Sequence, residues 1–324
     1  MNFRTEVPLP KSALKIDFQD KILSLGSCFA SNIADKLSSQ KFSVCNNPFG
    51  VLFNPVSIKN NIQLLINNII EPDFKIFEYN NLWHSWFFHE NFSTNTQSEI
   101  ETKIQDTITS VGSYLKEAKI LIITFGTAYT YSLKNEDFVV SNCHKAPTAW
   151  FKKDRLTITE IIDFYNDIIL KIQDYNPEIE IIFTVSPIRH WADGAHENQL
   201  SKSILLLAID EIIKQNAKTH YFPAYEIVLD ELRDYRFYAE DMLHPNNVSI
   251  NYIWELFSKS YFSEKTQKAL ISIEKINKSI LHKPFFPTSD AYKKHIAATV
   301  EHCKQAQKDF GIDYQKEIEL LKKI

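Results

Sequence analysis

Two small nucleophiles stand side by side near the start of the chain. Ser27 and Cys28 follow an apolar run at residues 22–25 and a glycine, and a segment of helical character comes directly after them. The backbone N–H groups at the start of a helix are free, and the helix dipole favours negative charge there. A hydroxyl or thiol at this turn could therefore attack an electrophile, and an oxyanion formed beside it would be stabilised.

A second chemical cluster lies far along the chain, in the segment EDMLHPN at 240–246. Asp241 and His244 are three residues apart and precede a helix that we expect to begin near Asn247. A serine hydroxyl needs an adjacent base, histidine is the usual one, and a carboxylate fixes the tautomer of that histidine. The order of these residues predicts Ser27 as nucleophile, His244 as general base and Asp241 as its orienting partner.

Each half of this pattern also has a structural explanation. A serine after a strand commonly caps a helix, and an aspartate before His-Pro can do the same. Their occurrence together, at opposite ends of one strand-and-helix pattern, favours catalysis. Cys28 is the alternative nucleophile, because a helix N-terminus can lower the pKa of a thiol. We prefer to interpret Cys28 as a small residue that packs the helix on the sheet.

The elements that must position these residues alternate along the chain. Apolar runs at 21–25, 119–125, 178–185 and 220–228, with a shorter one at 42–45, predict strands, and the patterns at 29–40, 56–70, 97–118, 157–174 and 195–216 predict helices. Apolar runs without strict alternation are typical of strands buried on both faces. The sequence therefore predicts an α/β fold with a mostly parallel sheet, whose sites lie at the carboxyl ends of the strands.

Two segments depart from this alternation. Residues 71–96 are crowded with aromatic side chains and predict an inserted hairpin, which is either a satellite patch of core or a lid over a substrate. After residue 262 the strand patterns end, and 263–280, 288–307 and 312–323 read as helices rich in Lys and Glu. We expect a main domain over 1–262 and a helical C-terminal extension over 263–324, which packs against that domain or against a second subunit of a homo-oligomer.

Composition excludes several classes of function. The chain has 324 residues and a formal net charge of −4, without a basic run, which argues against a nucleic-acid partner. It has no apolar run of the roughly 18 residues that a membrane span needs and no signal-like N-terminus, so we expect a cytoplasmic protein. The four cysteines are scattered without a CxxC, as in a reducing compartment. We expect no metal and no cofactor, and GSCFAS lacks the later glycines of a dinucleotide-binding loop.

Six ordered stretches of the chain resemble the GSCFA family, a group of bacterial proteins within the SGNH (GDSL-like) hydrolase superfamily. They are GSCFA (26–30), NPFGVLFNP (47–55), FGTAYTY (125–131), NCHK (142–145), SPIRHWADGAHENQLSK (186–202) and DMLHPN (241–246). The resemblance covers roughly residues 1–260. It implies a flavodoxin-like three-layer α/β/α sandwich and acyl-ester chemistry.

The resemblance also implies roles for individual residues. Ser27 would be the nucleophile, His244 the base and then the acid toward the leaving alcohol, and Asp241 the residue that orients His244. The backbone N–H groups of Ser27 and Gly50 would form the oxyanion hole, in which each donor is worth roughly 3 kcal/mol.

One departure from the superfamily pattern concerns the oxyanion hole. Its third block normally reads Gly-x-Asn-Asp, and the asparagine side chain completes the hole. Here Ala128 stands at the asparagine position and cannot donate. Either the hole has two donors or another side chain supplies the third, and Asn142 is the best candidate, followed by Thr127.

Further polar residues are expected to contact the substrate. Arg189 and His190 follow a predicted strand at the same sheet edge. Arg189 either pairs with a nearby aspartate, Asp193 or Asp241, or holds a carboxylate or phosphate of the substrate in a bidentate grip. His144 and His89 are further candidates for the pocket, as is Thr127.

The expected function is a serine esterase or deacylase acting on an O-acyl ester of a sugar or small metabolite. An O-acyltransferase would use the same acyl-enzyme while excluding water. A non-catalytic binding module on the same scaffold is the alternative from another class: the missing third-block asparagine favours it, and the intact Ser27, Asp241 and His244 argue against it. The fold does not determine the substrate.

Overall fold

A five-stranded parallel sheet forms the centre of the computed structural model, which describes residues 4–67, 74–136 and 138–323. Its order is β10-β9-β5-β1-β2; numbered along the chain and read from β2, this is 2-1-3-4-5, the flavodoxin-like arrangement. The strands are β1 (Lys21–Gly26), β2 (Ser43–Asn46), β5 (Ile120–Phe125), β9 (Glu180–Val185) and β10 (Thr219–Tyr221). The predicted fold class is confirmed.

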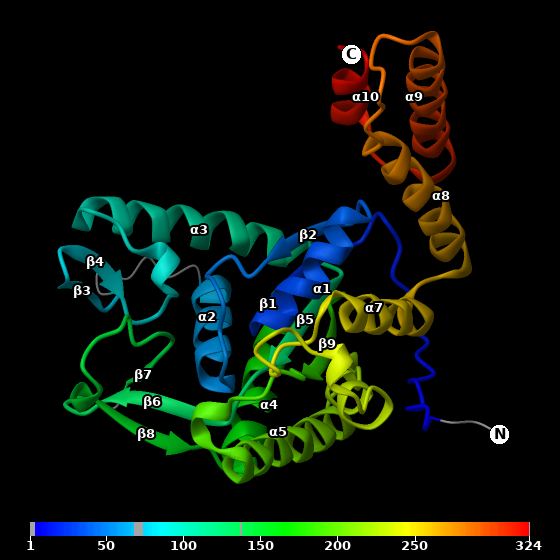
Figure 1. Cartoon of the computed structure of the whole chain (residues 1–324). Coiled ribbons are helices and arrows are strands. Elements are labelled where there is room, and N and C mark those ends of the chain that lie inside the picture. Colours follow the sequence, from blue (N-terminus) through cyan, green and yellow to red (C-terminus); the bar gives the residue numbers. More distant parts are fainter. Residues whose placement is uncertain (1–3, 68–73, 137, 324) are drawn as a thin grey trace.

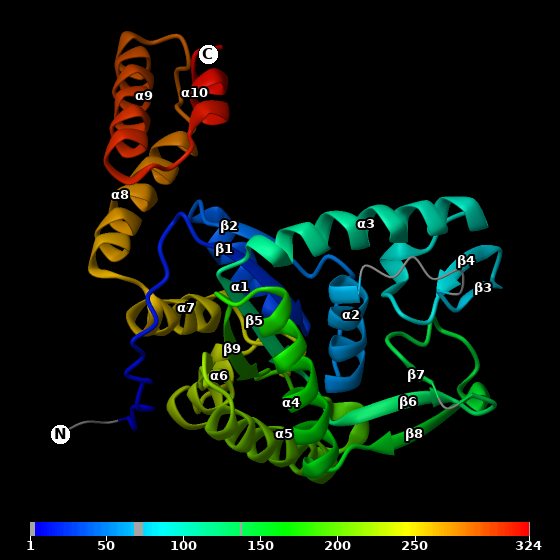
Figure 2. The same ribbon diagram turned by 180° about the vertical axis from the view of Figure 1, so that it is seen from behind.

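Helices cover both faces of this sheet (Figures 1 and 2). Alternate strand residues face opposite ways: Leu23 and Leu25 of β1 join the core on one face, and Ile22 joins the core on the other. The first face carries α2 (Pro55–Asn67), α3 (Gln97–Glu117), α4 (Ile158–Tyr175) and α5 (Ala195–Gln215), and the second carries α1 (Cys28–Ser39) and α7 (Asn247–Tyr261). The result is a three-layer sandwich.

The prediction for residues 220–228 was wrong over most of its length. Strand β10 ends at Tyr221, and the chain then turns into α6 (Ala224–Glu226) and a π-helical turn (Ile227–Glu231). The apolar residues Ala224, Ile227 and Val228 recur at helical spacing and are buried in the core beneath α7, so packing favours the helix. The last three positions of the predicted helix 56–70 lie outside the described residues.

A second sheet was missed by the sequence patterns. Strands β6 (Tyr129–Leu133), β7 (Val139–Val140) and β8 (Phe151–Arg155) form an antiparallel sheet in the order β7-β6-β8. The predicted hairpin near 71–96 is present as β3 (Ile76–Tyr79) and β4 (Leu82–Ser85), and residues 71–73 lie outside the described part of the chain. Trp86 of this segment is buried against Val140 and Phe151 of the missed sheet.

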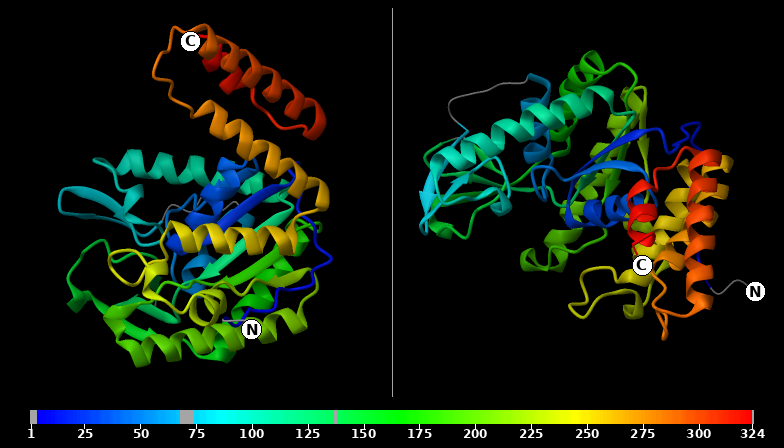
Figure 3. Two further views of the ribbon diagram at one scale, coloured as in Figure 1. Left: turned by 45° about the vertical axis from the view of Figure 1, so that its right-hand side comes forward. Right: turned by 90° about the horizontal axis from the view of Figure 1, so that it is seen from above.

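Three helices at the C-terminal end form an arm that extends from the sheet (Figures 1 and 3). They are α8 (Glu264–Ile280), α9 (Asp290–Phe310) and α10 (Gln315–Leu321). Their apolar faces form a separate small core around Ile273, Cys303 and Tyr314. Among the described residues, none of the helices is both long enough and apolar enough to cross a membrane.

Candidate active site

The turn between β1 and α1 is shaped by a glycine. Gly26 has φ +143°, and a Cβ added there would lie 2.3 Å from the carbonyl oxygen of Thr124 on β5. This close approach leaves no room for a residue larger than glycine at position 26. The N–H of Gly26 donates to Oδ1 of Asn47 at 2.8 Å, and its carbonyl accepts from the N–H of Leu52 at 2.9 Å. The close approach of β1 and β5 therefore fixes where the next residue lies.

Ser27 occupies the N-cap position of α1 without capping the helix. An N-cap serine normally accepts a hydrogen bond from the first turn. Here the hydroxyl is buried and has no hydrogen-bond partner among the described residues. The Ser27 N–H donates to the carbonyl of Thr124 at 3.2 Å, so this predicted oxyanion donor is engaged within the fold. The hydroxyl is left without a structural role.

His244 and Asp241 form a local hydrogen-bonded pair. Nδ1 of His244 lies 2.6 Å from Oδ2 of Asp241, and Oδ1 of Asp241 accepts the N–H groups of Leu243 at 2.9 Å and His244 at 3.0 Å. These backbone bonds, with the side-chain bond from His244, lower the pKa of Asp241 to about 2. The carboxylate is therefore ionised at neutral pH and fixes the orientation of the ring.

The other ring nitrogen of His244 faces the tip of β1. Nε2 lies 3.7 Å from Sγ of Cys28. Burial raises the pKa of the Cys28 thiol, with a smaller opposing effect from the backbone N–H groups of Cys28 and Phe29. The ring thus lies in the cavity that Ser27 and Cys28 share, in contact with a thiol whose thiolate form is disfavoured by burial.

A cavity of about 560 Å³ opens in front of these residues. Ser27, Cys28 and His244 line it together with residues from the segment before α2, from the chain after β5 and β9, and from the missed sheet and the loop after β7. These include Phe53, Asn54, Thr127, Tyr129, Tyr131, Val140, Asn142, Ile188, Arg189, His190 and Trp191. The described residues of 74–96 contribute nothing to this wall, whereas Tyr129 and Tyr131 of β6 and Val140 of β7 do line it.

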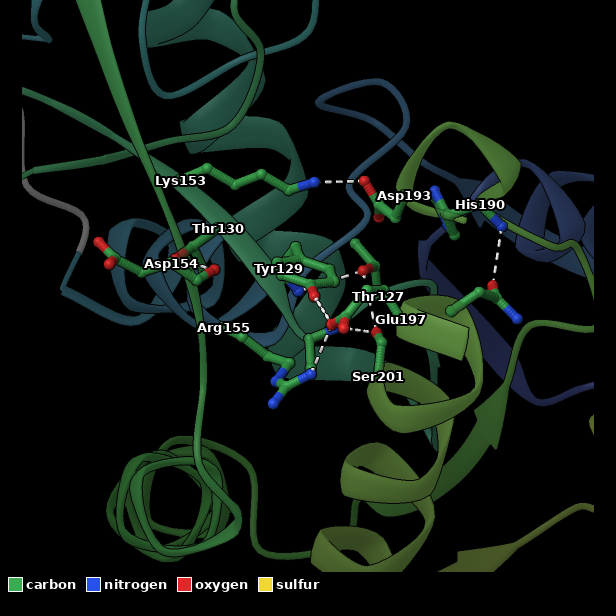
Figure 4. Close-up of polar contacts among 12 residues, drawn as sticks. Thr127, Tyr129, Thr130, Lys153, Asp154, Arg155, His190, Asp193, Glu197 and Ser201 are labelled. Atoms are coloured by element: carbon green, nitrogen blue, oxygen red, sulfur yellow. Dashed lines mark hydrogen bonds and ion pairs between the residues drawn. The ribbon is translucent and has the colours of Figure 1, made fainter. Parts of the chain in front are cut away.

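Polar contacts fasten the wall of the cavity to α5 (Figure 4). The hydroxyl of Tyr129 and the guanidinium of Arg155, from β6 and β8, both bind the carboxylate of Glu197, with Arg155 Nη1 at 2.7 Å from Oε2. Lys153 of β8 forms an ion pair with Asp193, in the turn before α5. These contacts hold the second sheet beside the carboxyl ends of the central strands.

A fully buried lysine was missed by the sequence patterns. Lys202 of α5 is 0% exposed, and its Nζ donates to the carbonyls of Gly126 at 2.6 Å and Ser186 at 2.7 Å. Burial lowers its pKa to about 7, and the charge of Arg189 adds to this effect. Lys202 thus ties the ends of β5 and β9 together behind the cavity. Its position at the end of the stretch SPIRHWADGAHENQLSK was the only signal for it in the sequence.

Two asparagines present their amide groups at the cavity. Oδ1 of Asn54 accepts the N–H of Ser57 at 2.8 Å, in the first turn of α2, and Oδ1 of Asn142 accepts the N–H of His144 at 2.7 Å. Because each oxygen is used by the backbone, each NH₂ group remains as a donor. Asn142 was predicted from the sequence, whereas Asn54 was not singled out within NPFGVLFNP.

Three predicted site residues lie elsewhere. Gly50 donates its N–H to the carbonyl of Asn47 at 2.7 Å and packs against His89, and neither residue lines the cavity. His144 is buried beside Phe77 and Trp86, with Nε2 2.9 Å from the carbonyl oxygen of Ser85, and burial lowers its pKa to about 4. The aromatic packing of this segment accounts for the place of His144. His89 is held instead by its backbone N–H, which donates to the carbonyl of Phe49 at 3.1 Å.

The remaining predicted substrate contacts do line the cavity. Thr127 bonds Ser201 through its hydroxyl at 3.1 Å. His190 donates its backbone N–H to Asn198 at 2.9 Å, and burial lowers the pKa of its ring to about 4. Arg189 is not paired with Asp193 or Asp241, the two aspartates considered from the sequence, because these bind Lys153 and His244.

The fold and this site define an α/β protein that gathers a serine, a cysteine and an Asp–His pair at the carboxyl end of its sheet. Comparison with family models identifies it further. The GSCFA family matches residues 21–257, so the chain belongs to this family. A second model, described as the GSCFA domain protein, C-terminal domain, matches residues 273–324. A comparison with curated proteins gave no match.

Solved structures that resemble the chain include two carbohydrate esterases. One is a Corynascus thermopiles (Myceliophthora fergusii) carbohydrate esterase family 2 enzyme plus carbohydrate binding domain, with 18% identity, a TM-score of 0.26, and coverage of 44% of this chain and 36% of that one. The other is the Clostridium thermocellum family 3 carbohydrate esterase, with 10% identity, a TM-score of 0.32, and coverage of 78% and 98%. These scores are too low to support a shared function.

Proposed function

We propose that this protein is a serine esterase or deacylase of SGNH type that hydrolyses an O-acyl ester of a sugar or small metabolite. One observation carries the proposal. His244, held by Asp241 through Nδ1 at 2.6 Å, lines the same cavity as the buried hydroxyl of Ser27, which has no hydrogen-bond partner among the described residues. A base with a fixed tautomer beside a free hydroxyl is the minimum that nucleophilic acyl transfer needs.

The reaction follows from these roles. Ser27 Oγ attacks the ester carbonyl while Nε2 of His244 takes the hydroxyl proton, and Asp241 stabilises the resulting imidazolium. The tetrahedral intermediate collapses to an acyl-Ser27, and His244 returns the proton to the leaving alcohol. Water, deprotonated by His244, then attacks the acyl-enzyme, releases the carboxylic acid and restores the serine.

Cys28 competes with Ser27 for the base. Nε2 of His244 is 3.7 Å from the Cys28 sulfur, a contact that favours the thiol, whereas burial raises the pKa of that thiol and disfavours the thiolate. The side chain of His244 is 47% exposed, so burial does not block a small shift of the ring toward Ser27 that keeps its Nδ1 bond to Asp241. Catalytic hydrogen bonds often form only in that complex.

A fluorophosphonate probe tests which side chain reacts. We expect intact-mass spectrometry to find one probe adduct on the wild-type protein, none on Ser27→Ala and one on Cys28→Ala. Turnover of p-nitrophenyl acetate that is lost in Cys28→Ala and kept in Ser27→Ala would assign the reaction to the thiol. A folded wild-type protein without an adduct, and without turnover of short p-nitrophenyl esters, would overturn the proposal in favour of a non-catalytic binding module.

Asn54 is our candidate for the missing oxyanion donor. The segment that carries it is bound to both neighbouring strand ends, because the N–H of Leu52 donates to Gly26 at 2.9 Å and the carbonyl of Phe53 accepts the N–H groups of Gly126 and Thr127 at 2.8 and 3.0 Å. Its amide is therefore fixed beside the turn that holds Ser27, and the side chain is 6% exposed.

Replacing Asn54 by serine separates donation from helix capping. A serine hydroxyl can accept the Ser57 N–H as Asn54 does, so stability should change little. Loss of the amide donor should lower kcat by roughly 100- to 1,000-fold with KM nearly unchanged. Asn142→Ser is the matched comparison, and initial rates on p-nitrophenyl acetate measure both. If Asn142→Ser shows this loss and Asn54→Ser does not, Asn142 is the donor instead.

A further inference from the structure

A second cavity adjoins the first. It has a volume of about 380 Å³ and shares Arg189 and Trp191 with the active-site cavity. Asp241, the partner of His244, also lines it, so the catalytic turn stands between the two spaces. Its remaining lining residues are Val228, Leu229, Arg233, Asp234, Tyr235, Tyr238, Met242 and Leu243.

Among the residues that the structure describes, Arg189 is the cation of this wall that forms no ion pair with a carboxylate. Its Nε is buried without a hydrogen-bond partner among the described residues, and its guanidinium lies 5.0 Å from the centre of the Trp191 ring. The nearby charges are paired with others: Arg233 with Asp230 at 3.2 Å, Asp234 with Arg236 at 3.7 Å, and Asp241 with His244. A guanidinium with a desolvated and unpaired N–H is suited to an oxyanion.

The rim of the second cavity is aromatic and exposed. Trp191 is 50% exposed and Tyr235 is 72% exposed, and Tyr238 lies beside Tyr235 with ring centres 6.0 Å apart. Tyr and Trp combine an apolar ring with a polar tip and are enriched at binding interfaces. Within the part of the chain that the structure describes, the wall therefore combines the unpaired cation of Arg189 with flat apolar surfaces.

We propose that the alcohol portion of the substrate carries a carboxylate or phosphate, which Arg189 binds in the second cavity. This inference rests on the proposed function, because His244 protonates the leaving oxygen and the alcohol must then lie against His244, on the side that opens to Arg189. The substrate class is an acyl ester of an anionic ring-bearing alcohol, such as a sugar acid or a phosphorylated sugar. The guanidinium takes such a group through two parallel N–H bonds.

Binding to the Ser27→Ala variant tests the anion site without catalysis. Titration calorimetry with 4-hydroxybenzoate and with its neutral methyl ester should give a roughly 10- to 100-fold preference for the anion, which is the range of one charge-assisted pair. Phenyl phosphate in place of the carboxylate separates the two anions. Adding Arg189→Met should remove the preference, whereas adding Arg236→Gln, a neighbouring exposed arginine outside both linings, should leave it intact.

Kinetics then connect the site with the reaction. With Ser27 intact, we compare the ratio of kcat/KM for 4-acetoxybenzoate to kcat/KM for its methyl ester. This ratio should be roughly tenfold or more lower in Arg189→Met than in the wild-type protein. If Ser27→Ala binds 4-hydroxybenzoate and its methyl ester equally well, the anion site is overturned. This measurement does not depend on the folding of an Arg189 variant. Anion-selective binding without any ester turnover would instead leave the site standing and refute the esterase.

Discussion

Asp241→Asn is expected to lower kcat by roughly 10,000-fold while leaving the protein folded. The carboxylate accepts the Nδ1 proton of His244 and so keeps Nε2 free to act as the base. An amide presents an N–H at that position as readily as an oxygen, which favours the tautomer whose Nε2 carries the proton and cannot accept one. The loss should appear in kcat rather than in KM, because the interaction matters only when charge develops on the ring.

Asparagine is the informative replacement because Asp241 has a second task. Its Oδ1 accepts the N–H groups of Leu243 and His244, and an asparagine Oδ1 can do the same. Asp241→Ala removes both tasks and serves as the comparison for loss of the turn. Steady-state kinetics on one aryl ester, with circular dichroism on each variant, measure the two effects. If Asp241→Asn retains more than a tenth of the wild-type kcat, Asp241 is a turn residue and not part of the catalytic machinery.

The pH dependence follows from the same contacts. Backbone N–H groups lower the pKa of Asp241 to about 2, so it stays ionised from about pH 4 upward. Protonation of Asp241 should therefore contribute nothing to any loss of activity between pH 5 and 7. The pH profile of kcat/KM for the wild-type enzyme, compared with that of Asp241→Asn, checks this expectation.

The central strands, and the position of Ser27 and His244 at one edge of the sheet, were predictable because their sequence signal is local. The buried strands β1, β5 and β9 appear as uninterrupted apolar runs, and the order Ser27, Asp241, His244 is visible once those runs are aligned as one sheet. The structure brings Ser27 and His244 to one cavity as this order requires. Parallel topology converts positions far apart in sequence into neighbours at one sheet edge.

The unpredicted parts depend on tertiary contacts. Strand β8 reads FKKDR, which has no apolar period, and it is held by pairing with β6 and by ion pairs to the start of α5. Lys202 is a residue type that is almost never fully buried, so composition alone places it on the surface. Strand-like residues at 224–228 became helical because the core beneath α7 accepts them in that form. None of these outcomes is encoded in a short window of sequence.

The second large effect that we expect concerns the stability of the protein and comes from Lys202. Its Nζ donates to the carbonyls of Gly126 and Ser186, and a neutral amine has two N–H groups for these two acceptors. A proton on the amine would add a third N–H without an acceptor among the described residues. Other ionisable groups in reach are Cys28, Arg189 and His190, and the Tyr225 ring centre lies 5.7 Å away. The folded state therefore favours the neutral form.

The sign of the pH dependence is fixed by this preference. The pKa of Lys202 falls from 10.5 to about 7 on folding, so between these values the unfolded chain binds one more proton than the folded one. The stabilising contribution is then fully present above the unfolded pKa and is lost as pH falls toward the folded pKa. Through this window the free energy of unfolding should rise by up to roughly 1.4 kcal/mol per pH unit because of Lys202 alone.

Lys202→Met should remove that slope and loosen the site. Urea titrations from about pH 7 to pH 10 should give a stability gap between wild type and variant that widens with pH, because methionine has no proton to release and leaves the two carbonyls unpaired. Lys214→Met, on the exposed side of the same helix, should show no widening, since Asp210 raises the pKa of that lysine. A gap that stays constant across this range would mean that Lys202 is buried with its proton. Its third N–H would then have to find an acceptor in the cavity, and the ends of β5 and β9 would be held by a charge instead of a neutral amine.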